Sequence, residues 1–370
     1  MSSEKMVKIL SEQTLYDLPG KFAAWPSLAR TASGELLVVF SGDRKHHVDP
    51  YGKILLMRSI DNGETWSGPE VINDSPFDDR DPGIVVCPDG SWLVSLFTSN
   101  MFATWPEAVD YYGEEEVARW QPYIDRLTAE LERDYLGQFT LVSQNHGKSW
   151  SAFRPVPVHA PHGPIVVGDQ LLYLGTEATT EGARISCYAS DDLGESWQLR
   201  GVLSAARTLT DIYLCEPHLV KLADGHLLGQ MRVNSAGVEK RQLMQSISAD
   251  GGRSWSPVET TGLWGLPPQL LQHSSGALLS SYGHRRAPFG QRVALSFDAG
   301  KSWPEVFSFG EIDYRERTNA EDVGEIYYQI PDLGYPATVE LEDGSLYSVW
   351  YQSRPDGTDA LICGCCWTFS

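Results

Sequence analysis

Short runs of apolar or alternating residues, separated by glycine turns, follow one another along the whole chain. Five segments begin with a proline and reach a turn glycine eight positions later, and an apolar run such as Leu346-Tyr-Ser-Val-Trp350 then follows. This pattern predicts a strand, a tight turn and a second strand. The five segments are Pro26…Gly34, Pro82…Gly90, Pro217…Gly225, Pro268…Gly276 and Pro336…Gly344, with a shorter variant at Pro164…Gly168.

A second motif, S-x-D-x-G-x-x-W, alternates with the first. Its serine and aspartate oxygens suit the N–H groups of a tight turn, its glycine suits a positive φ, and its tryptophan suits a cover over the sheet. We therefore interpret the motif as a structural hairpin. The five copies are Ser59–Trp66, Ser143–Trp150 (with Asn145 in place of the aspartate), Ser190–Trp197, Ser248–Trp255 and Ser296–Trp303.

Together the two repeats predict six units of four antiparallel strands, at about 50 residues per unit. This spacing is typical of an all-β, six-bladed β-propeller, with residues 1–370 forming a single domain. The last unit has no S-x-D box and lacks an outer strand. The N-terminal run at residues 7–10 or 14–16 is expected to supply that strand, because closing the ring protects sheet edges.

A helical insertion is predicted at about residues 104–136, in the second blade. Trp120, Tyr123, Ile124 and Leu127 recur at helical spacing, and Thr104 with a glutamate three positions later suits a helix start. We expect one short and one longer helix. They could form a lid or a homodimer contact, or simply pack on the blade.

The strand order also predicts where reactive side chains gather. In a propeller the first strand of each unit is innermost, so residues before each proline and residues that end each second strand meet at one mouth of the channel. Ionisable groups and tyrosines at that mouth suggest binding or catalysis on an acidic or polyhydroxyl ligand. These positions and the first hairpin loop hold Arg80, Asp81, His162, Glu216, Tyr335, Arg44, Glu177, Arg232, His284, Arg285, Tyr351, His47 and Asp49.

Charge and composition narrow the function classes. The 370 residues include 29 Lys+Arg and 49 Asp+Glu, which gives a net charge of −20. A nucleic-acid-binding protein needs a basic face, and an anionic membrane surface would repel this chain, so neither partner is expected. A few arginines can still make a local positive pocket for an anionic sugar.

Cysteines and segments near the N-terminus add three expectations. The six cysteines show no zinc-ligand spacing, and no metal or other cofactor is predicted. No apolar run approaches the length of a membrane span, and residues 1–10 lack the apolar core of a secretory signal. We expect a cytoplasmic protein if the chain is complete, and a secreted one if a leader has been removed.

The boxes, the sixfold repeat and the mouth residues resemble the sialidase (neuraminidase) superfamily over nearly the whole chain. That resemblance implies an activating glutamate at Glu216, clamp arginines at Arg232 and at Arg285 or Arg286, and a tyrosine nucleophile at Tyr335. It leaves Asp49 as a loose candidate for the acid. His47 is the alternative acid on chemical grounds, because a neutral imidazole suits proton transfer near neutral pH. In that family a neutral tyrosine avoids the repulsion that a carboxylate nucleophile would meet from an acidic sugar.

One feature departs from the family pattern. Sialidases open the first blade with Arg-Ile-Pro, whereas this chain has Ala24-Trp25-Pro26. Arg80 could replace the missing clamp arginine, with Asp81, Arg44, His162, His284, Glu177 and Tyr351 as further substrate contacts.

Three functions follow from these patterns. The first is a sialidase-like, exo-acting glycoside hydrolase that removes a terminal acidic sugar from an oligosaccharide or glycan. The second is a lyase that cuts next to a uronic acid, with His47 or Tyr335 removing a proton. The third is a propeller that binds glycans without catalysis.

Overall fold

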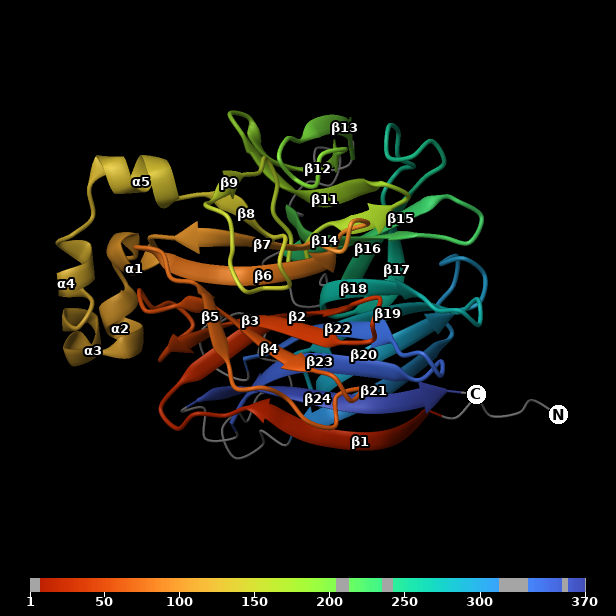
Figure 1. The fold of residues 1–370 in the computed structure, drawn as a ribbon, viewed down its shortest axis with the longest axis horizontal. Coiled ribbons are helices and arrows are strands. Elements are labelled where there is room, and N and C mark those ends of the chain that lie inside the picture. The colour runs from red at the N-terminus through yellow and green to blue at the C-terminus, as the bar shows by residue number, and fades with distance from the viewer. Residues whose placement is uncertain (1–6, 204–212, 235–241, 313–331, 355–358, 370) are drawn as a thin grey trace.

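In the computed structural model, which describes residues 7–203, 213–234, 242–312, 332–354 and 359–369, the strands form five sheets (Figure 1). The first strands of the units line a central channel. Four sheets have four strands each, and a fifth has eight. Sequential strands lie next to one another in every sheet, as the hairpin repeats predict. The all-β, propeller-like arrangement is therefore confirmed.

The four-stranded sheets each comprise consecutive strands. They are β6 (Asp78–Val86), β7 (Trp92–Ser99), β8 (Gln138–Ser143) and β9 (Arg154–Pro155); β10 (Ile165–Val167), β11 (Gln170–Thr179), β12 (Gly182–Ser190) and β13 (Gln198–Val202); β14 (Tyr213–Lys221), β15 (Leu227–Asn234), β16 (Gln242–Ser248) and β17 (Glu259–Trp264); and β18 (Leu266–Gln272), β19 (Leu278–His284), β20 (Phe289–Ser296) and β21 (Glu305–Ile312).

The eight-stranded sheet joins the two ends of the chain. Its strands are β22 (Leu333–Glu340), β23 (Leu346–Ser353), β24 (Ala360–Phe369), β2 (Phe22–Arg30), β3 (Leu36–Arg44), β4 (Lys53–Ser59) and β5 (Glu70–Asn73), with β1 (Val7–Tyr16) paired to β24.

The expectation of six separate blades is therefore wrong for this sheet. Four blades are separate four-stranded sheets, whereas the first and last units share one sheet. A single parallel pairing, Phe22 with Ala360, connects β2 to β24. The predicted N-terminal closure does occur, because β1 runs antiparallel to β24 from Val7 opposite Phe369 to Tyr16 opposite Ile362.

The S-x-D boxes form the hairpin turns that their residues predict. In the third copy the Ser190 hydroxyl donates to Asp192 Oδ1 at 2.8 Å and accepts the Gly194 N–H at 2.8 Å. Asp192 Oδ1 also accepts the Ser196 N–H at 2.9 Å. The copies at Ser59, Ser143, Ser248 and Ser296 have the corresponding serine–glycine bond. The boxes thus stabilise turns and carry no candidate catalytic group.

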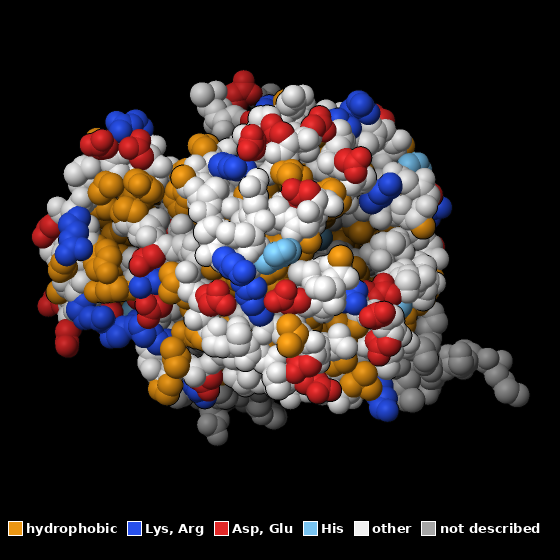
Figure 2. All heavy atoms as spheres, in the orientation of Figure 1, with side chains coloured by type: hydrophobic (Ala, Val, Ile, Leu, Met, Phe, Trp, Pro, Cys, Tyr) orange, Lys and Arg blue, Asp and Glu red, His pale blue; other side chains and the backbone are white. Residues whose placement is uncertain are grey.

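The insertion between β7 and β8 contains five short helices, rather than the one short and one longer helix expected. They gather at one side of the ring, and hydrophobic side chains are visible among them in Figure 2. Thr104 ends a helix instead of starting one, whereas Thr128 Oγ1 accepts the Leu131 N–H at 3.2 Å and caps the last helix. The helices are α1 (Met101–Thr104), α2 (Ala108–Tyr112), α3 (Glu114–Ala118), α4 (Gln121–Ile124) and α5 (Ala129–Tyr135).

None of the helices in the described ranges has the length and apolar character needed to cross a membrane.

Candidate active site

Several first strands place a non-glycine residue in the left-handed region just ahead of their proline. The φ values are 55° for Trp25, 46° for Asp81, 47° for Glu216 and 52° for Tyr335, and His162 has 73° in the shorter variant. The pairing register shifts at the first four positions, so each is a bulge. This conformation is costly for residues with a Cβ and clusters at functional sites. Its repetition indicates that the bulges aim these side chains.

The first group at the site joins Tyr335, Glu216 and Arg232, which come from β22, β14 and β15. The Tyr335 hydroxyl donates to Glu216 Oε1 at 2.8 Å. Arg232 Nη1 donates to both carboxylate oxygens of Glu216, at 2.8 and 2.7 Å. Glu216 is therefore held in place by one charged partner, and its Oε1 accepts hydrogen bonds from both Arg232 and the tyrosine.

Tyr335 is a neutral phenol in the resting site. It is 4% exposed, and burial together with the nearby Glu216 and Asp81 carboxylates raises its pKa well above the ordinary value, although Arg232 opposes this shift. The Tyr335 oxygen can become a nucleophile only by passing its proton to an acceptor. Glu216 is that acceptor by geometry.

A second group surrounds Asp332, a residue that no repeat or motif of the chain singled out. Asp332 Oδ2 lies 2.7 Å from His47 Nδ1, and its Oδ1 accepts the Tyr351 hydroxyl at 2.5 Å. Arg285 Nη2 donates to Tyr351 Oη at 2.9 Å and lies 3.5 Å from Asp332 Oδ1. Arg285, rather than Arg286, belongs to the site.

The pKa values of this group follow from burial and charge. Burial alone raises the pKa of Asp332, but the His47 ring, Arg285 and the Tyr351 hydroxyl outweigh that effect and lower it to about 2. Burial lowers the pKa of His47 even though Asp332 opposes the shift. An ionised carboxylate that orients an imidazole is an arrangement suited to proton transfer.

Trp25 occupies the position where the family has its first clamp arginine. Two guanidinium groups lie close to its ring, with the Cζ of Arg44 4.7 Å and the Cζ of Arg80 4.1 Å from its centroid. Both arginines also bind Asp78 Oδ2, Arg44 Nη2 at 2.7 Å and Arg80 Nη1 at 3.1 Å. One carboxylate oxygen thus binds both cations, and the Asp49 and Asp81 carboxylates lie near Arg44 and Arg80 respectively.

Arg80, Arg232 and Arg285 all lie close enough to Tyr335 to interact electrostatically with its phenol. The ring of Tyr335 lies 5.8 Å from that of Tyr351, which links the first two groups. Three arginines from three different sheets therefore surround one tyrosine.

Asp81 is a buried carboxylate between these groups. Its side chain is 6% exposed, and its Oδ1 has no hydrogen-bond partner among the described residues. Burial raises the pKa of Asp81 to about 7; Arg80 opposes this shift and Glu216 supports it. Asp81 therefore changes protonation state near neutral pH, as a general acid should.

The structure does not place every predicted residue at the mouth. Asp49 is fully buried and accepts the N–H groups of Lys45 and Tyr51, so it organises its own loop. Arg44 is fully buried too and donates to the carbonyls of His46 and His47. Both side chains lie within the wall of the site and cannot reach a ligand in this conformation.

Three further predicted residues do not join the groups around the tyrosine. Glu177 is occupied within its own sheet by Arg184, Ser186 and Tyr188. His284 bonds the Pro288 carbonyl at 3.0 Å through Nδ1. His162 lies next to Tyr335, with ring centroids 6.4 Å apart, but its ring lines a separate cavity further along the channel.

The helical insertion packs against the loop that carries His47. The ring of His46 stacks on that of Tyr112 at 4.6 Å, and the Val48 N–H donates to the Tyr112 hydroxyl at 3.4 Å. Lys45 Nζ lies 3.1 Å from Glu116 Oε2. Helices α2 and α3 therefore fix this loop beside the site.

Within the part of the chain that the structure describes, no group of three or more His, Cys, Asp or Glu side chains is arranged to hold a metal ion.

The family can now be stated from comparison with known proteins. Residues 116–348 match the model of the BNR repeat-like domain. The chain is a BNR-repeat protein of the sialidase superfamily. A sialidase of Micromonospora viridifaciens is 25% identical over 334 residues, which is 80% of this chain and 48% of that protein. The BNR-repeat chain thus spans about half the length of this relative.

Two solved structures share the fold of this BNR-repeat protein at low identity. A protein of unknown function from Dyadobacter fermentans has a TM-score of 0.76 and 20% identity, with 98% of this chain and 99% of that one covered. An α-L-arabinanase of Penicillium chrysogenum, complexed with arabinobiose, has a TM-score of 0.64 and 15% identity, with 97% and 98% covered.

The sequence patterns of this BNR-repeat protein did not predict two residues of the site, Asp78 and Asp332. Asp78 lies two positions before Arg80, and alternation along a strand puts both on one face, which was a usable signal. Asp332 follows a long polar insertion and lies outside every repeat, so no pattern singled it out.

Proposed function

We propose that the protein is a glycoside hydrolase that releases a terminal sugar from a glycan, with Tyr335 as nucleophile and Glu216 as its activating base. The observation that carries this proposal is the 2.8 Å hydrogen bond from the Tyr335 hydroxyl to Glu216 Oε1. A phenol aimed at a fixed carboxylate in a buried site is the arrangement of an activated nucleophile.

The proposed reaction has two steps. Tyr335 Oη bonds to the anomeric carbon while its proton moves to Glu216, and the glycosidic oxygen leaves with a proton from an acid. Water then attacks the same carbon, gives a proton to the conjugate base of that acid, and Tyr335 recovers its proton from Glu216. Two displacements at one carbon retain its configuration.

Asp81 is our choice for the acid. It is buried, borders the tyrosine and has a pKa of about 7, so the protonated form is available at neutral pH. Asp49 was the sequence-based candidate, but its carboxylate is held by two backbone N–H groups of its own loop. His47 remains the alternative acid.

An acidic sugar is the substrate class that the charges favour. Glu216 and Asp332 each face one arginine, whereas Asp78 faces both Arg44 and Arg80. The protonated form of Asp81 adds no negative charge. A substrate carboxylate near Arg80 would therefore meet a guanidinium that shares its bound carboxylate oxygen with Arg44.

The relatives support a glycan substrate without fixing the sugar. They include a sialidase and an arabinanase, which act on different sugars. The ring can host both chemistries, so the choice between them depends on the side chains of the mouth.

A lyase is the second candidate, and the His47–Asp332 pair is the observation that favours it. A neutral imidazole oriented by a carboxylate could remove the proton next to the carboxylate of a uronic acid, while Arg285 or Arg80 stabilises the resulting charge. The C–O bond then breaks, and a conjugated double bond forms in the sugar. A glycan-binding propeller without catalysis is the third proposal.

A mass-spectrometric screen separates these functions. The protein should be incubated with oligosaccharides that end in sialic acid, in a uronic acid or in neutral arabinose. A hydrolase adds water to the released sugar, a lyase product absorbs in the ultraviolet, and a binder releases nothing. An activated fluorinated glycoside of the accepted sugar should label Tyr335, and labelling of another residue would contradict the mechanism.

Two further proposals concern assembly. We count the eight-stranded sheet as two blades, β2–β5 and β22–β24 with β1, because one pairing alone connects β2 to β24. We also propose a homodimer through the helical insertion, where Val109 and Tyr111 are 40% and 41% exposed.

A further inference from the structure

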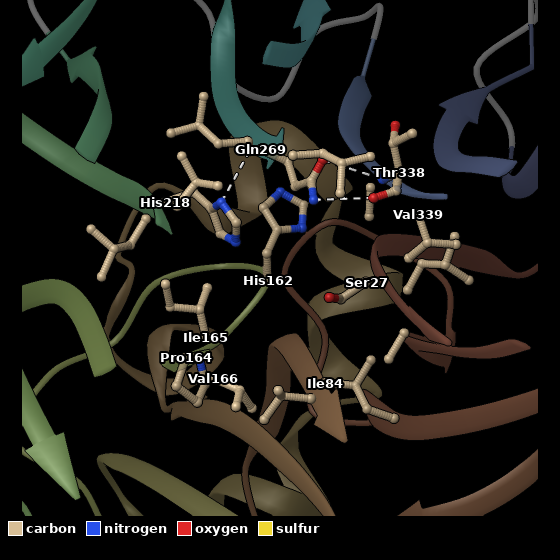
Figure 3. Close-up of a pocket in the computed structure, with 18 of the residues that line it drawn as sticks. Ser27, Ile84, His162, Pro164, Ile165, Val166, His218, Gln269, Thr338 and Val339 are labelled. Atoms are coloured by element: carbon tan, nitrogen blue, oxygen red, sulfur yellow. Dashed lines mark hydrogen bonds between the residues drawn. The ribbon is translucent and has the colours of Figure 1, made fainter. Parts of the chain in front are cut away.

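A second cavity lies in the central channel, beyond the bulges that form the candidate active site. Its volume is about 420 Å³, and it is lined by residues that follow the prolines of β2, β6, β14, β18 and β22, and by residues 164–166 (Figure 3). The strands run away from the mouth in this stretch, so the cavity belongs to the opposite half of the channel.

The charge of this cavity differs from that of the whole protein. Among the described residues that line it, Arg30 and Lys221 are cationic and none is Asp or Glu, although the chain carries a net charge of −20. Arg30 Nε is buried without a hydrogen-bond partner in the described structure. Its acidic neighbour is Glu342, 3.9 Å away and with a side chain 91% exposed. A distant, solvated carboxylate neutralises a guanidinium poorly.

The end of the cavity nearest the mouth carries two histidines (Figure 3). His162 is 5% exposed, and neither of its ring nitrogens has a hydrogen-bond partner among the described residues. Burial lowers its pKa well below the ordinary value, so the ring is neutral and offers one donor and one acceptor. A buried polar group without a partner is costly and calls for a ligand or ordered water.

His218 adds a donor beside it. Its Nδ1 accepts the Leu270 N–H at 3.0 Å, so the proton of the neutral ring is on Nε2. The two rings lie 5.8 Å apart. Because Nε2 of His218 is protonated, it cannot ligate a metal ion while the bond to Leu270 persists. The pair is suited instead to a hydroxyl group, which can accept one hydrogen bond and donate another.

Apolar side chains also line the cavity, among them Ile84, Ile165, Val166 and Val339 (Figure 3). From Ser27 to Arg30 the strand advances about 10 Å, at roughly 3.3 Å per residue. The distance suits one ring-sized apolar group between two polar ends.

We propose that this cavity binds a small organic anion that has a carboxylate at one end, an apolar ring in the middle and a hydroxyl at the other end. The carboxylate lies between Arg30 and Lys221, and the hydroxyl lies between His162 and His218. This site is separate from the proposed hydrolase site and does not depend on it.

Three commercial probes test the chemistry by titration calorimetry on the full-length protein. 4-Hydroxyphenylacetate carries all three features, phenylacetate lacks the hydroxyl, and tyramine replaces the carboxylate with an ammonium group. We expect 4-hydroxyphenylacetate to bind, phenylacetate to bind about tenfold more weakly for the lost hydrogen bond, and tyramine not to bind. Absence of binding by both acids, or equal binding of tyramine, would refute the proposal.

Variants locate the binding site. Arg30→Met and Lys221→Met should each weaken 4-hydroxyphenylacetate at least about tenfold, since each removes a charged partner. His162→Asn, which keeps a side chain tolerated at positive φ, should abolish the difference between the two acids. Arg154→Met, at an exposed ion pair elsewhere, is the control.

The catalytic mouth also contains arginines, so one more variant is needed. Tyr335→Phe should leave 4-hydroxyphenylacetate binding unchanged. If binding falls in Tyr335→Phe and persists in Arg30→Met, the anion occupies the mouth and the cavity proposal is wrong. If His162→Asn does not fold, the binding affinities of Arg30→Met and Lys221→Met still decide the result.

Discussion

The hydroxyl of Tyr335 lies 2.8 Å from the carboxylate of Glu216, although 119 positions separate these residues in the chain. Each sits on a bulge in the first strand of its own sheet, in the left-handed region of backbone space. Ring closure and two local kinks therefore bring a proton donor and its acceptor into contact.

Removing either partner should abolish turnover. Tyr335→Phe lacks the nucleophilic oxygen, and Glu216→Gln cannot accept its proton, so each should lower kcat by about 10³-fold or more on the substrate found in the screen. Tyr135→Phe, at a tyrosine 39% exposed on α5, should keep full activity. Full activity in both site variants would contradict the proposed mechanism.

The activity should depend on the protonation of Asp81. With a pKa of about 7, Asp81 loses its proton as the pH rises through neutrality, so kcat/KM should fall on the alkaline side. Asp81→Asn should lose about 10²–10⁴-fold on natural substrates and much less on substrates with an activated leaving group. Exposed Asp110→Asn is the matched control. An unchanged alkaline limb in Asp81→Asn would assign the acid to another residue.

Asp332 should affect stability at low pH. Its pKa in the folded protein is about 2, below the ordinary 3.8, so it stabilises the fold above about pH 4, and this contribution disappears as the pH falls through about 2. The contribution amounts to about 2 kcal/mol in the free energy of unfolding. Urea titrations between pH 2 and 7 should show a smaller acid loss in Asp332→Asn than in the wild type. Identical pH profiles would contradict the assignment.

A box serine should matter more than the exposed serine of the same box. Ser190→Ala leaves the buried Gly194 N–H without its acceptor and should lower the free energy of unfolding by about 1–3 kcal/mol. Ser196→Ala removes an exposed hydroxyl and should cost less. Denaturant titration of both variants measures the difference, and equal losses would contradict the structural role given to the box.

The helical insertion should influence catalysis through the His47 loop. Tyr112→Ala removes the ring that stacks on His46 and the oxygen that accepts the Val48 N–H, so kcat should fall while the melting temperature changes little. Tyr112→Phe keeps the ring and should restore most of the activity. A large loss in Tyr112→Phe would instead point to a direct role for the hydroxyl.

Local patterns along the chain were enough to predict the sheets. The boxes and the proline–glycine segments specify turns and strands through short-range rules, so the propeller-like arrangement could be predicted without any long-range information. The joining of the first and last units into one sheet could not be predicted, because the Phe22–Ala360 pairing depends on how the ends meet. The predicted helix boundaries were also wrong, because tertiary contacts divide the insertion into short helices.

The site was predictable where it follows the repeat and unpredictable elsewhere. Tyr335 and Glu216 occupy equivalent positions of different units, and Arg232 ends the second strand of the unit that holds Glu216. The structure brings all three together. Asp49 looked equally suitable, but its burial depends on the fold of a loop that has no repeat. Asp332 lies outside every repeat, so its contacts with His47 and Arg285 become visible only in three dimensions.

The backbone bulges ahead of the prolines set where the site side chains point, whereas the identity of each side chain sets the chemistry. Backbone bulges, rather than particular side chains, produce the inward turn. Equivalent positions on these bulges therefore hold Trp25, Asp81, Glu216 and Tyr335. A substitution at one of these positions changes which group faces the substrate and leaves the hairpins beneath it in place. Such a ring can acquire a new specificity by few single-residue changes, and Trp25, which stands where the resemblance to sialidases implies an arginine, occupies one of these positions.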